Sequence, residues 1–291
     1  MKLPVYWGCM IQTNEYAYEM STRQVLHKLG VDLVDLEGVS CCGAPMRHIN
    51  GVAGVYLALR NLATADSEGY KELLVPCNGC HLSFREAMHF IEENEKHKEK
   101  INQVLASEDL EYGLDLRLYH TIEFFHDRIG LERIKKSVVK PLENLTLASH
   151  TGCHILRPSD MNGVADDPEK PRKLDRLIEV LGAKTIDYPE KLDCCGSGLL
   201  LSHGETTLTM AGMKVWAIQE RKVDGLVDSC PACHMMFDGR QDASSNTIGK
   251  KISFPVIYYT QLLGLAMGID SEKLGLHLNL SPIDSLTERI G

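Results

Sequence analysis

Short apolar runs rich in β-branched residues alternate with longer stretches of helical periodicity along the whole chain. The first half places apolar runs at 4–7, 31–36 and 73–75 around helical patterns at 16–29 and 52–65. The second half places them at 145–148, 185–188 and 226–227 around helical patterns at 172–181 and 206–223. Strands that alternate with helices form parallel sheets covered by helices. The pattern therefore predicts an α/β fold of two Rossmann-like βαβ halves related by an internal pseudo-two-fold repeat.

The cysteines follow the same duplication. From Cys42 to Cys77 is 35 positions, and from Cys195 to Cys230 is 35 positions again. Each half holds a lone cysteine, an adjacent pair and a Cys-x-x-Cys motif: Cys9, Cys41, Cys42, Cys77 and Cys80, then Cys153, Cys194, Cys195, Cys230 and Cys233. An internal repeat of this length predicts two copies of one unit. We expect a first cysteine-rich domain at 1–144 and a second at 145–291.

Short motifs around the cysteines also recur. Gly8-Cys9 returns as Gly152-Cys153, Cys41-Cys42-Gly43 as Cys194-Cys195-Gly196, and Cys77-Asn78-Gly79-Cys80-His81 as Cys230-Pro231-Ala232-Cys233-His234. The last two motifs are offset by 153 positions and the first by 144, so the second half carries nine extra residues. We place them in the Pro- and Asp-rich stretch 158–171, because loops accept insertions. A weaker repeat relates Tyr119-His120-Thr121 to Tyr258-Tyr259-Thr260.

Charge and hydropathy narrow the classes of function. The 31 Lys and Arg against 40 Asp and Glu give a net charge of −9, which argues against sequence-independent binding of nucleic acid. The chain has no run of about 18 apolar residues, and its first residues lack the pattern of a signal peptide. We therefore expect no membrane span and a cytoplasmic location, where thiols stay reduced.

The predicted fold gathers the five thiols of each half. Each cysteine motif follows a predicted strand, and the carboxyl ends of parallel strands meet at one edge of the sheet. Cys77 and Cys80 open a predicted helix, whose N-terminus favours thiolates. Gly43 loosens the turn after Cys41-Cys42, so both sulfurs can face one site. A cubane iron–sulfur cluster or a structural zinc takes four ligands. The fifth thiol is a spare, a redox partner or a bridging ligand.

Covalent haem is a rival interpretation, because both Cys-x-x-Cys-His motifs match its attachment signature. It leaves six of the ten cysteines without a role. It also conflicts with the expected cytoplasmic location. We therefore interpret His81 and His234 as residues that pack against the cysteine-bearing helices or donate hydrogen bonds near them.

The doubled pattern resembles the cysteine-rich (CCG) domain family to which the B subunit of heterodisulfide reductase belongs, over about residues 1–270. The resemblance implies two non-cubane [4Fe-4S] clusters, one held by the five cysteines of each half. It implies a substrate, the coenzyme M–coenzyme B heterodisulfide (CoM-S-S-CoB), and an oxidoreductase that splits this disulfide in methanogenesis with one electron from each cluster. The implied partners are the ferredoxin-like C subunit, the flavin-bearing, electron-bifurcating A subunit and a nickel–iron hydrogenase.

The anionic ends of that substrate would require cations near the motifs. Candidate substrate-binding residues are Arg47, His48, Lys250 and Lys251, for each of which an ordinary surface role is the alternative. His154 follows Cys153 and is the candidate catalytic residue. Its imidazole could supply a proton to a departing thiolate.

Two other functions fit parts of the pattern. An iron–sulfur electron-transfer or scaffold subunit of a quinone- or fumarate-linked dehydrogenase would hold iron in one half and structural zinc in the other. A thiol-disulfide or zinc-binding protein without a cluster would need only one Cys-x-x-Cys. Metal content separates the three hypotheses.

Overall fold

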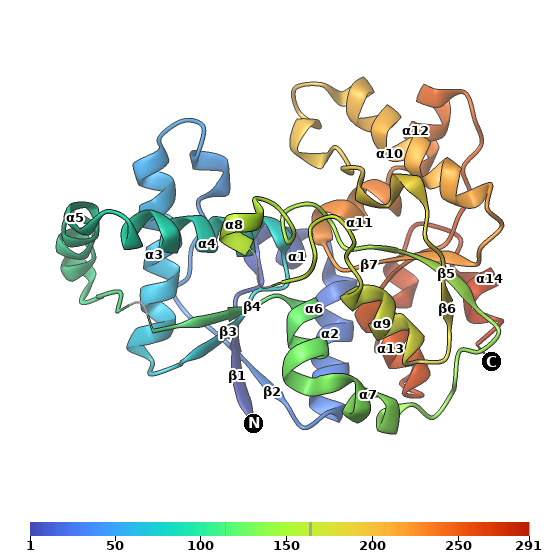
Figure 1. The fold of residues 1–291 in the computed structure, drawn as a ribbon, viewed down its shortest axis with the longest axis horizontal. Coiled ribbons are helices and arrows are strands. Elements are labelled where there is room, and N and C mark those ends of the chain that lie inside the picture. The colour runs from blue at the N-terminus through green and yellow to red at the C-terminus, as the bar shows by residue number, and fades with distance from the viewer. Residues whose placement is uncertain (114, 163–164, 291) are drawn as a thin grey trace.

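The computed structural model describes residues 1–113, 115–162 and 165–290. Two four-stranded sheets, one in each half, are parallel throughout (Figure 1). The first has the order β2-β1-β3-β4, with β1 Lys2–Val5, β2 Asp32–Asp35, β3 Glu72–Leu74 and β4 Arg117–Tyr119. The second has the order β6-β5-β7-β8, with β5 Thr146–His150, β6 Lys184–Thr185, β7 Gly225–Asp228 and β8 Val256–Tyr258. The identical order confirms the predicted α/β fold of two similar halves.

Helices connect the strands in the same way in both halves. The first half contains α1 Gly8–Thr13, α2 Tyr16–Lys28, α3 Gly51–Ser67, α4 Asn78–Glu92, α5 Glu95–Leu105, α6 Thr121–Glu123 and α7 Leu131–Ser137. The second contains α8 Ser159–Asn162, α9 Lys173–Glu179, α10 Gly204–Gln219, α11 Pro231–Phe237, α12 Gln241–Ile248, α13 Tyr259–Ala266 and α14 Asp284–Thr287. The four predicted long helical patterns correspond to α2, α3, α9 and α10.

The weak repeat of Tyr119-His120-Thr121 as Tyr258-Tyr259-Thr260 marks one strand in each half that the sequence pattern did not predict. Tyr119 ends β4 and Tyr258 ends β8, and each strand lies at the edge of its sheet. Each is followed at once by a helix, α6 or α13. With three residues each, these strands are too short to carry a two-residue hydrophobic period.

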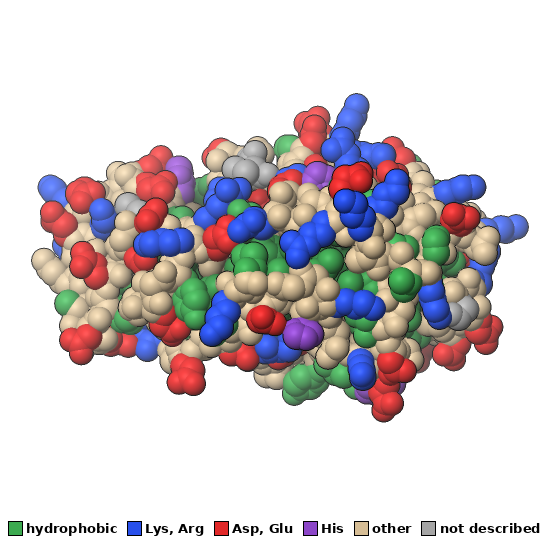
Figure 2. Space-filling model, turned by 90° about the horizontal axis from the view of Figure 1, so that it is seen from below, with side chains coloured by type: hydrophobic (Ala, Val, Ile, Leu, Met, Phe, Trp, Pro, Cys, Tyr) green, Lys and Arg blue, Asp and Glu red, His purple; other side chains and the backbone are tan. Residues whose placement is uncertain are grey.

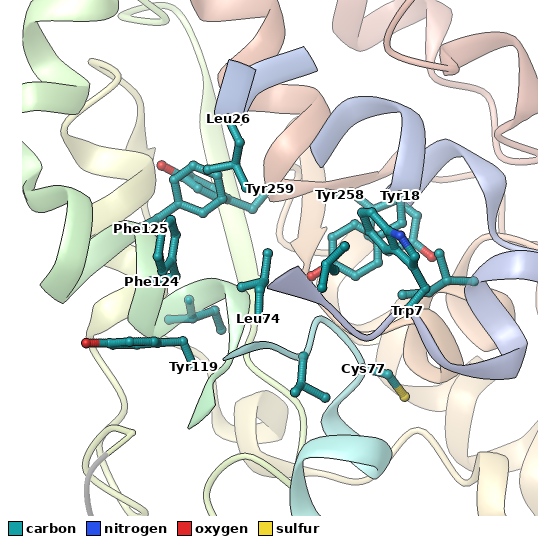
Figure 3. Packing of buried hydrophobic residues seen from close by; sticks show 14 of the residues in the cluster. Trp7, Tyr18, Leu26, Leu74, Cys77, Tyr119, Phe124, Phe125, Tyr258 and Tyr259 are labelled. Atoms are coloured by element: carbon teal, nitrogen blue, oxygen red, sulfur yellow. The ribbon is translucent and has the colours of Figure 1, made fainter. Parts of the chain in front are cut away.

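The largest hydrophobic core runs through both halves. It joins Leu3 and Val5 of β1 to Leu177 of α9 and Leu262 of α13. Tyr18 and Tyr258, from opposite halves, stack with ring centroids 4.3 Å apart, as Figure 3 shows. Helices α2 and α13 pack against one another across this boundary. The predicted boundary at 144/145 lies in the segment between α7 and β5 and stays a prediction, because the core is continuous across it.

Buried polar contacts also join the halves. Tyr18 Oη donates to the Ser229 carbonyl oxygen at 2.8 Å and lies 2.9 Å from Thr121 Oγ1. Asn78 Nδ2 donates to the Thr151 carbonyl oxygen at 2.9 Å. Ser229 precedes Cys230, and Thr151 stands two positions before Cys153, so these bonds fix cysteine-bearing segments of the second half to the first.

The surface carries both signs of charge. On the face drawn in Figure 2, basic and acidic side chains are interspersed, with apolar side chains showing between them near the centre. Among the described residues, none of the helices has both the length and the apolar character needed to cross a membrane.

Candidate functional site

All ten cysteines line one cavity. Its volume is about 400 Å³, and its wall includes five cysteines from each half. The motifs follow strands of both sheets, so the carboxyl ends of β1, β3, β5 and β7 lead into this cavity. The other lining residues include Met10, Pro45, His154, Leu199 and Met210. The structure therefore brings the two predicted sets of thiols together in a single space between the halves.

Left-handed glycines shape the turns after the cysteine pairs. Gly43 has φ +84°, and Gly196, at the equivalent position, has φ +80°. A Cβ atom on Gly43 would lie 2.2 Å from the Gly54 carbonyl oxygen of α3. The turn thus packs backbone against backbone, and only glycine allows both this contact and this φ. The prediction that a glycine turn presents both cysteines of a pair to one cavity is in line with this geometry.

Glycine also lets the backbone approach the Cys-x-x-Cys sulfurs. Gly8 has φ +73°, and a Cβ atom there would lie 2.7 Å from Cys80 Sγ. Gly152 has φ +86°, and its Cβ would lie 2.4 Å from Asn78 Nδ2 and 3.7 Å from Cys233 Sγ. Cys77 and Cys230 are the N-caps of α4 and α11, as the sequence predicted.

The thiols differ in their burial. Three in each half are buried: Cys42, Cys77, Cys80, Cys195, Cys230 and Cys233. The other four cavity-lining cysteines are exposed or half-buried: Cys9, Cys41, Cys153 and Cys194. Cys233 Sγ lies 3.4 Å from Cys195 Sγ, and Cys153 Sγ lies 4.0 Å from Cys194 Sγ.

The close thiols share protons. Hydrogen bonds donated by Cys153 and Cys195 lower the pKa of Cys194 to about 2, and donation to Cys194 with burial raises the pKa of Cys153. A hydrogen bond from Cys80 lowers the pKa of Cys42 to about 6 in the first half. Some thiols in each half thus ionise only at the expense of their neighbours. Release of all the protons requires a positively charged group among the sulfurs.

Comparison with known proteins identifies the family. The cysteine-rich domain (CCG) profile matches the chain twice, over residues 4–85 and 147–238, with five cysteines in each match. The B subunit of the ferredoxin/F420H2-dependent CoB-CoM heterodisulfide reductase of Methanosarcina acetivorans is 36% identical over 282 residues, covering 96% of this chain and 93% of its own length. The chain belongs to the CCG domain family of the heterodisulfide reductase B subunit.

The family is wider than one activity. The 8-methylmenaquinol:fumarate reductase membrane anchor subunit of Wolinella succinogenes is 28% identical, covering 94% of both chains. A crystal structure of a hypothetical protein from Helicobacter pylori has the same fold. Its TM-score is 0.78 at 15% identity, and the match covers 96% of this chain and 52% of that one.

The donor set of this CCG protein fits an iron–sulfur group. Ten soft thiol sulfurs line the cavity, and thiolates select iron–sulfur clusters, zinc and copper(I) over hard cations. Within 1–113, 115–162 and 165–290, no three Cys, His, Asp or Glu side chains converge on a site for a single metal ion. The fit to an iron–sulfur group therefore rests on the ten cysteine sulfurs and on the cavity that they line.

His154 lines the cysteine cavity, where the sequence placed it beside Cys153. Burial lowers its pKa, the Cys194 thiolate opposes this effect, and the Arg47 charge adds to it. The imidazole thus lines the cavity, and its neutral form is favoured.

The four candidate cations are outside that lining. Arg47 forms an ion pair with Glu86, with Nη1 2.9 Å from Oε1, beside a separate cavity of about 580 Å³ between α3, α4 and α8. His48 is exposed on the same segment. Lys250 Nζ lies 3.4 Å from the centroid of the Trp216 ring, and exposed Lys251 follows it. Their role toward a substrate stays a prediction.

Sequence inspection missed a buried pair near the second set of thiols. Lys214 of α10 is 1% exposed, and its Nζ lies 2.8 Å from His150 Nδ1. His150 Nε2 in turn lies 3.3 Å from Cys233 Sγ. Burial lowers the pKa of Lys214 to about 8, against the opposing effect of nearby negative charge, Cys233 first and Asp193 second. The sequence signal is only a difference between the repeats, with Asn61 at the equivalent position of the first half, and it does not indicate burial.

Proposed function

We propose that this chain is the catalytic subunit of a CoB–CoM heterodisulfide reductase. The observation that carries the proposal is the single cavity with five cysteines from each half. A disulfide takes up two electrons, and two equivalent donor sites on either side of one bond provide one electron each. The 36% identity to a heterodisulfide reductase B subunit over nearly the whole chain supports the same substrate.

Each half would hold one non-cubane [4Fe-4S] cluster. Cys9, Cys41, Cys42, Cys77 and Cys80 would ligate the first, and Cys153, Cys194, Cys195, Cys230 and Cys233 the second. When bound, such clusters supply single electrons and iron sites that accept thiolate sulfur. Five thiolates in each half would exceed by one the four that a cubane cluster takes, which is why we propose the non-cubane form.

The chain's own residues would orient the substrate and move protons. The reaction is CoM-S-S-CoB plus two electrons and two protons, giving two thiols. Met10, Pro45, Leu199 and Met210 give the cavity apolar walls, against which the hydrocarbon parts of the substrate would pack. His154, on the same wall, would donate a hydrogen bond to a departing thiolate in its neutral form and one proton in its protonated form.

Cations outside the cavity would hold the anionic ends of the substrate. Arg47 and His48 stand on the segment that follows the first cysteine pair, and Lys250 and Lys251 follow α12. We assign the first two residues to one anionic end and the lysines to the other. The sulfonate of coenzyme M and the phosphate of coenzyme B both bind such side chains by charge.

Electrons would come from partner proteins. The chain carries no flavin or nicotinamide fingerprint and no ferredoxin motif. We therefore propose that the ferredoxin-like C subunit delivers electrons from the flavin-bearing A subunit, itself fed by a nickel–iron hydrogenase, in the cytoplasm of a methanogen.

The fumarate reductase relative favours a second candidate function. Its 28% identity covers 94% of both chains. In this alternative, the chain passes electrons within a quinone- or fumarate-linked dehydrogenase, with a cluster in one half and structural zinc in the other. The two candidates therefore differ in metal content.

One experiment separates them. Protein purified without oxygen is assayed for iron, acid-labile sulfide and zinc, and then for reduction of CoM-S-S-CoB by a reduced viologen dye. About eight irons and eight sulfides per chain, with turnover, support the proposed function, since each cluster holds four of each. About four irons with one zinc, and no turnover, would favour the electron-transfer alternative.

A further inference from the structure

The Lys214 ammonium is held by three acceptors. Its Nζ donates to the carbonyl oxygens of Lys191, at 3.0 Å, and Asp193, at 2.9 Å, and to His150 Nδ1, at 2.8 Å. An ammonium group has three protons, and all three have an acceptor here. The geometry is therefore that of a charged lysine with every donor used.

No carboxylate forms an ion pair with Lys214 among the described residues, although the exposed carboxylate of Asp193 is close enough to act on its charge. Among the described hydrogen bonds and ion pairs, the buried carboxylate of Asp175 binds Lys191 Nζ at 2.7 Å, and none joins Lys214. A buried charge without a counterion is costly. The nearby groups that can carry negative charge are Cys233, the exposed Asp193 carboxylate, Cys195 and Cys194, in that order of effect.

His150 passes this charge on to one thiol. Its Nδ1 accepts from Lys214, so the ring proton sits on Nε2, which faces Cys233 Sγ at 3.3 Å. The ring is 2% exposed and its edge meets Phe237. His150 thus donates a fixed hydrogen bond to a cysteine sulfur.

The first half has neutral groups at the equivalent places. Asn61 stands 19 positions after Cys42, as Lys214 does after Cys195, and Tyr6 precedes Gly8 as His150 precedes Gly152, by two positions. Asn61 Oδ1 accepts from Ser40 N at 2.7 Å, and its Nδ2 donates to the Cys41 carbonyl oxygen at 3.1 Å. It holds the loop as Lys214 does, but without charge.

Tyr6 differs from His150 in the same sense. Its Oη donates to the Ser40 carbonyl oxygen at 2.6 Å, so its one proton is used in a hydrogen bond to the backbone. The first half therefore lacks both the buried cation and the imidazole donor at these two positions. The two sets of cysteines are alike in sequence but unlike in electrostatic surroundings.

We infer that Lys214 and His150 are positioning residues that make the cluster of the second half the more easily reduced of the two. The inference rests on the proposed function, because it requires a cluster in each half. A positive charge and a hydrogen bond to a ligand sulfur both favour the reduced, more negative state of a cluster. The first electron that reaches the chain resides on the second half.

Variants that keep one cluster test the order directly. C41A/C42A protein keeps the second set of cysteines, and C194A/C195A protein keeps the first. Both are loaded with iron and sulfide without oxygen, assayed for metal, and titrated with a redox dye while electron paramagnetic resonance follows reduction. The expected result is a higher midpoint potential in the protein that keeps the second set.

Substitutions at the two equivalent positions then assign the cause. Lys214→Gln retains an amide donor for the carbonyls but no charge, and we expect it to lower the midpoint potential of the second cluster. Asn61→Gln in the other protein is the matched control and should leave the first potential unchanged. His150→Phe should lower the second potential as well, and it tests the inference if Lys214→Gln protein does not fold.

The failures are distinguishable. Protein in which neither half holds iron would overturn the proposed function, and the inference with it. Iron-loaded protein with equal or reversed potentials would overturn the inference alone, as would a second potential that neither Lys214→Gln nor His150→Phe lowers.

Discussion

At the scale of single residues, glycine decides whether a pair of adjacent cysteines can serve one site. Neighbouring side chains on a strand point to opposite faces. At Gly43 and Gly196 the chain instead turns through the left-handed region, and both pairs line the cavity. The turn in the first half also lies against the backbone of α3 at Gly54. A methyl group at this turn would disturb conformation and packing together.

Gly43→Ala tests this directly. We expect it to destabilise the protein by at least about 2 kcal/mol, since an L side chain at positive φ costs about 1–2 kcal/mol and the new Cβ would meet backbone. Chemical denaturation measures the loss. Gly38→Ala is the control, because Gly38 has φ +68° and a Cβ atom added there would have no other atom within 4 Å. Equal losses in both variants would show that the contact with Gly54 contributes nothing.

Single cysteine substitutions test the assignment of ligands. Cys41→Ala should lose the iron of the first half only, and Cys194→Ala that of the second, so each retains about four irons. Both should abolish reduction of the heterodisulfide, because one cluster cannot supply both electrons. Iron analysis and the viologen assay check this. Full turnover in either variant would contradict a mechanism with two clusters.

The cysteines could be found from the sequence, whereas the groups that tune them could not. A spacing of 35 positions repeated in both halves identifies all ten thiols without a structure. Lys214 and His150 are 64 positions apart, and their contact depends on how α10 packs on β5. Lysine on a helix is ordinarily exposed, so its burial here is a tertiary effect.

At the scale of elements, α2 serves both halves. It follows the first strand of the first sheet, yet it packs against α13 of the second half. Ser21 Oγ and Thr260 Oγ1 lie 2.7 Å apart at this contact, and Tyr18 Oη reaches the Ser229 carbonyl oxygen just before Cys230. One helix thereby fixes the position of the second cysteine helix relative to the first half.

Tyr18→Phe should therefore weaken the contact between the halves. The change leaves a buried carbonyl and a buried hydroxyl without this partner, which costs about 1–3 kcal/mol. Thermal or chemical unfolding measures the loss. Tyr16→Phe on the same helix is the control, because Tyr16 is 49% exposed and should change stability little. The same small effect from both variants would show that the Tyr18 hydroxyl does not stabilise the interface.

The sequence predicted the long helices and six of the described strands, but not the last strand of either sheet. Helices α2, α3 and α10 have 13, 17 and 16 residues, enough for several turns of periodic pattern. The edge strands β4 and β8 have three residues each, too few for a period. Their pairing depends on the neighbouring strand and not on their own sequence.

At the scale of the whole molecule, the cavity lies between two halves that share a core. Its thiols repel one another once ionised, and the buried Lys214 offsets only part of that charge. A bound cationic iron group would relieve the repulsion and hold both halves together. Metal content and the stability of the entire fold are thus linked.

Removal of iron should lower the melting temperature of the whole protein in one cooperative step. The native state alone binds the group, so its loss removes binding free energy from folding. Scanning calorimetry of the loaded protein and of protein stripped with a chelator under reducing conditions measures the difference. Identical melting temperatures would show that the cavity is formed and stable without a bound group.

The unequal pairs Asn61 and Lys214, and Tyr6 and His150, have a consequence for assembly. A homodimer of one short polypeptide would place the same residue at both equivalent positions, so its two sites would be identical by symmetry. Fusion of the two copies into one chain lets each copy vary on its own. Such a chain can keep a cysteine set on either side of one disulfide bond and still give incoming charge a preferred side.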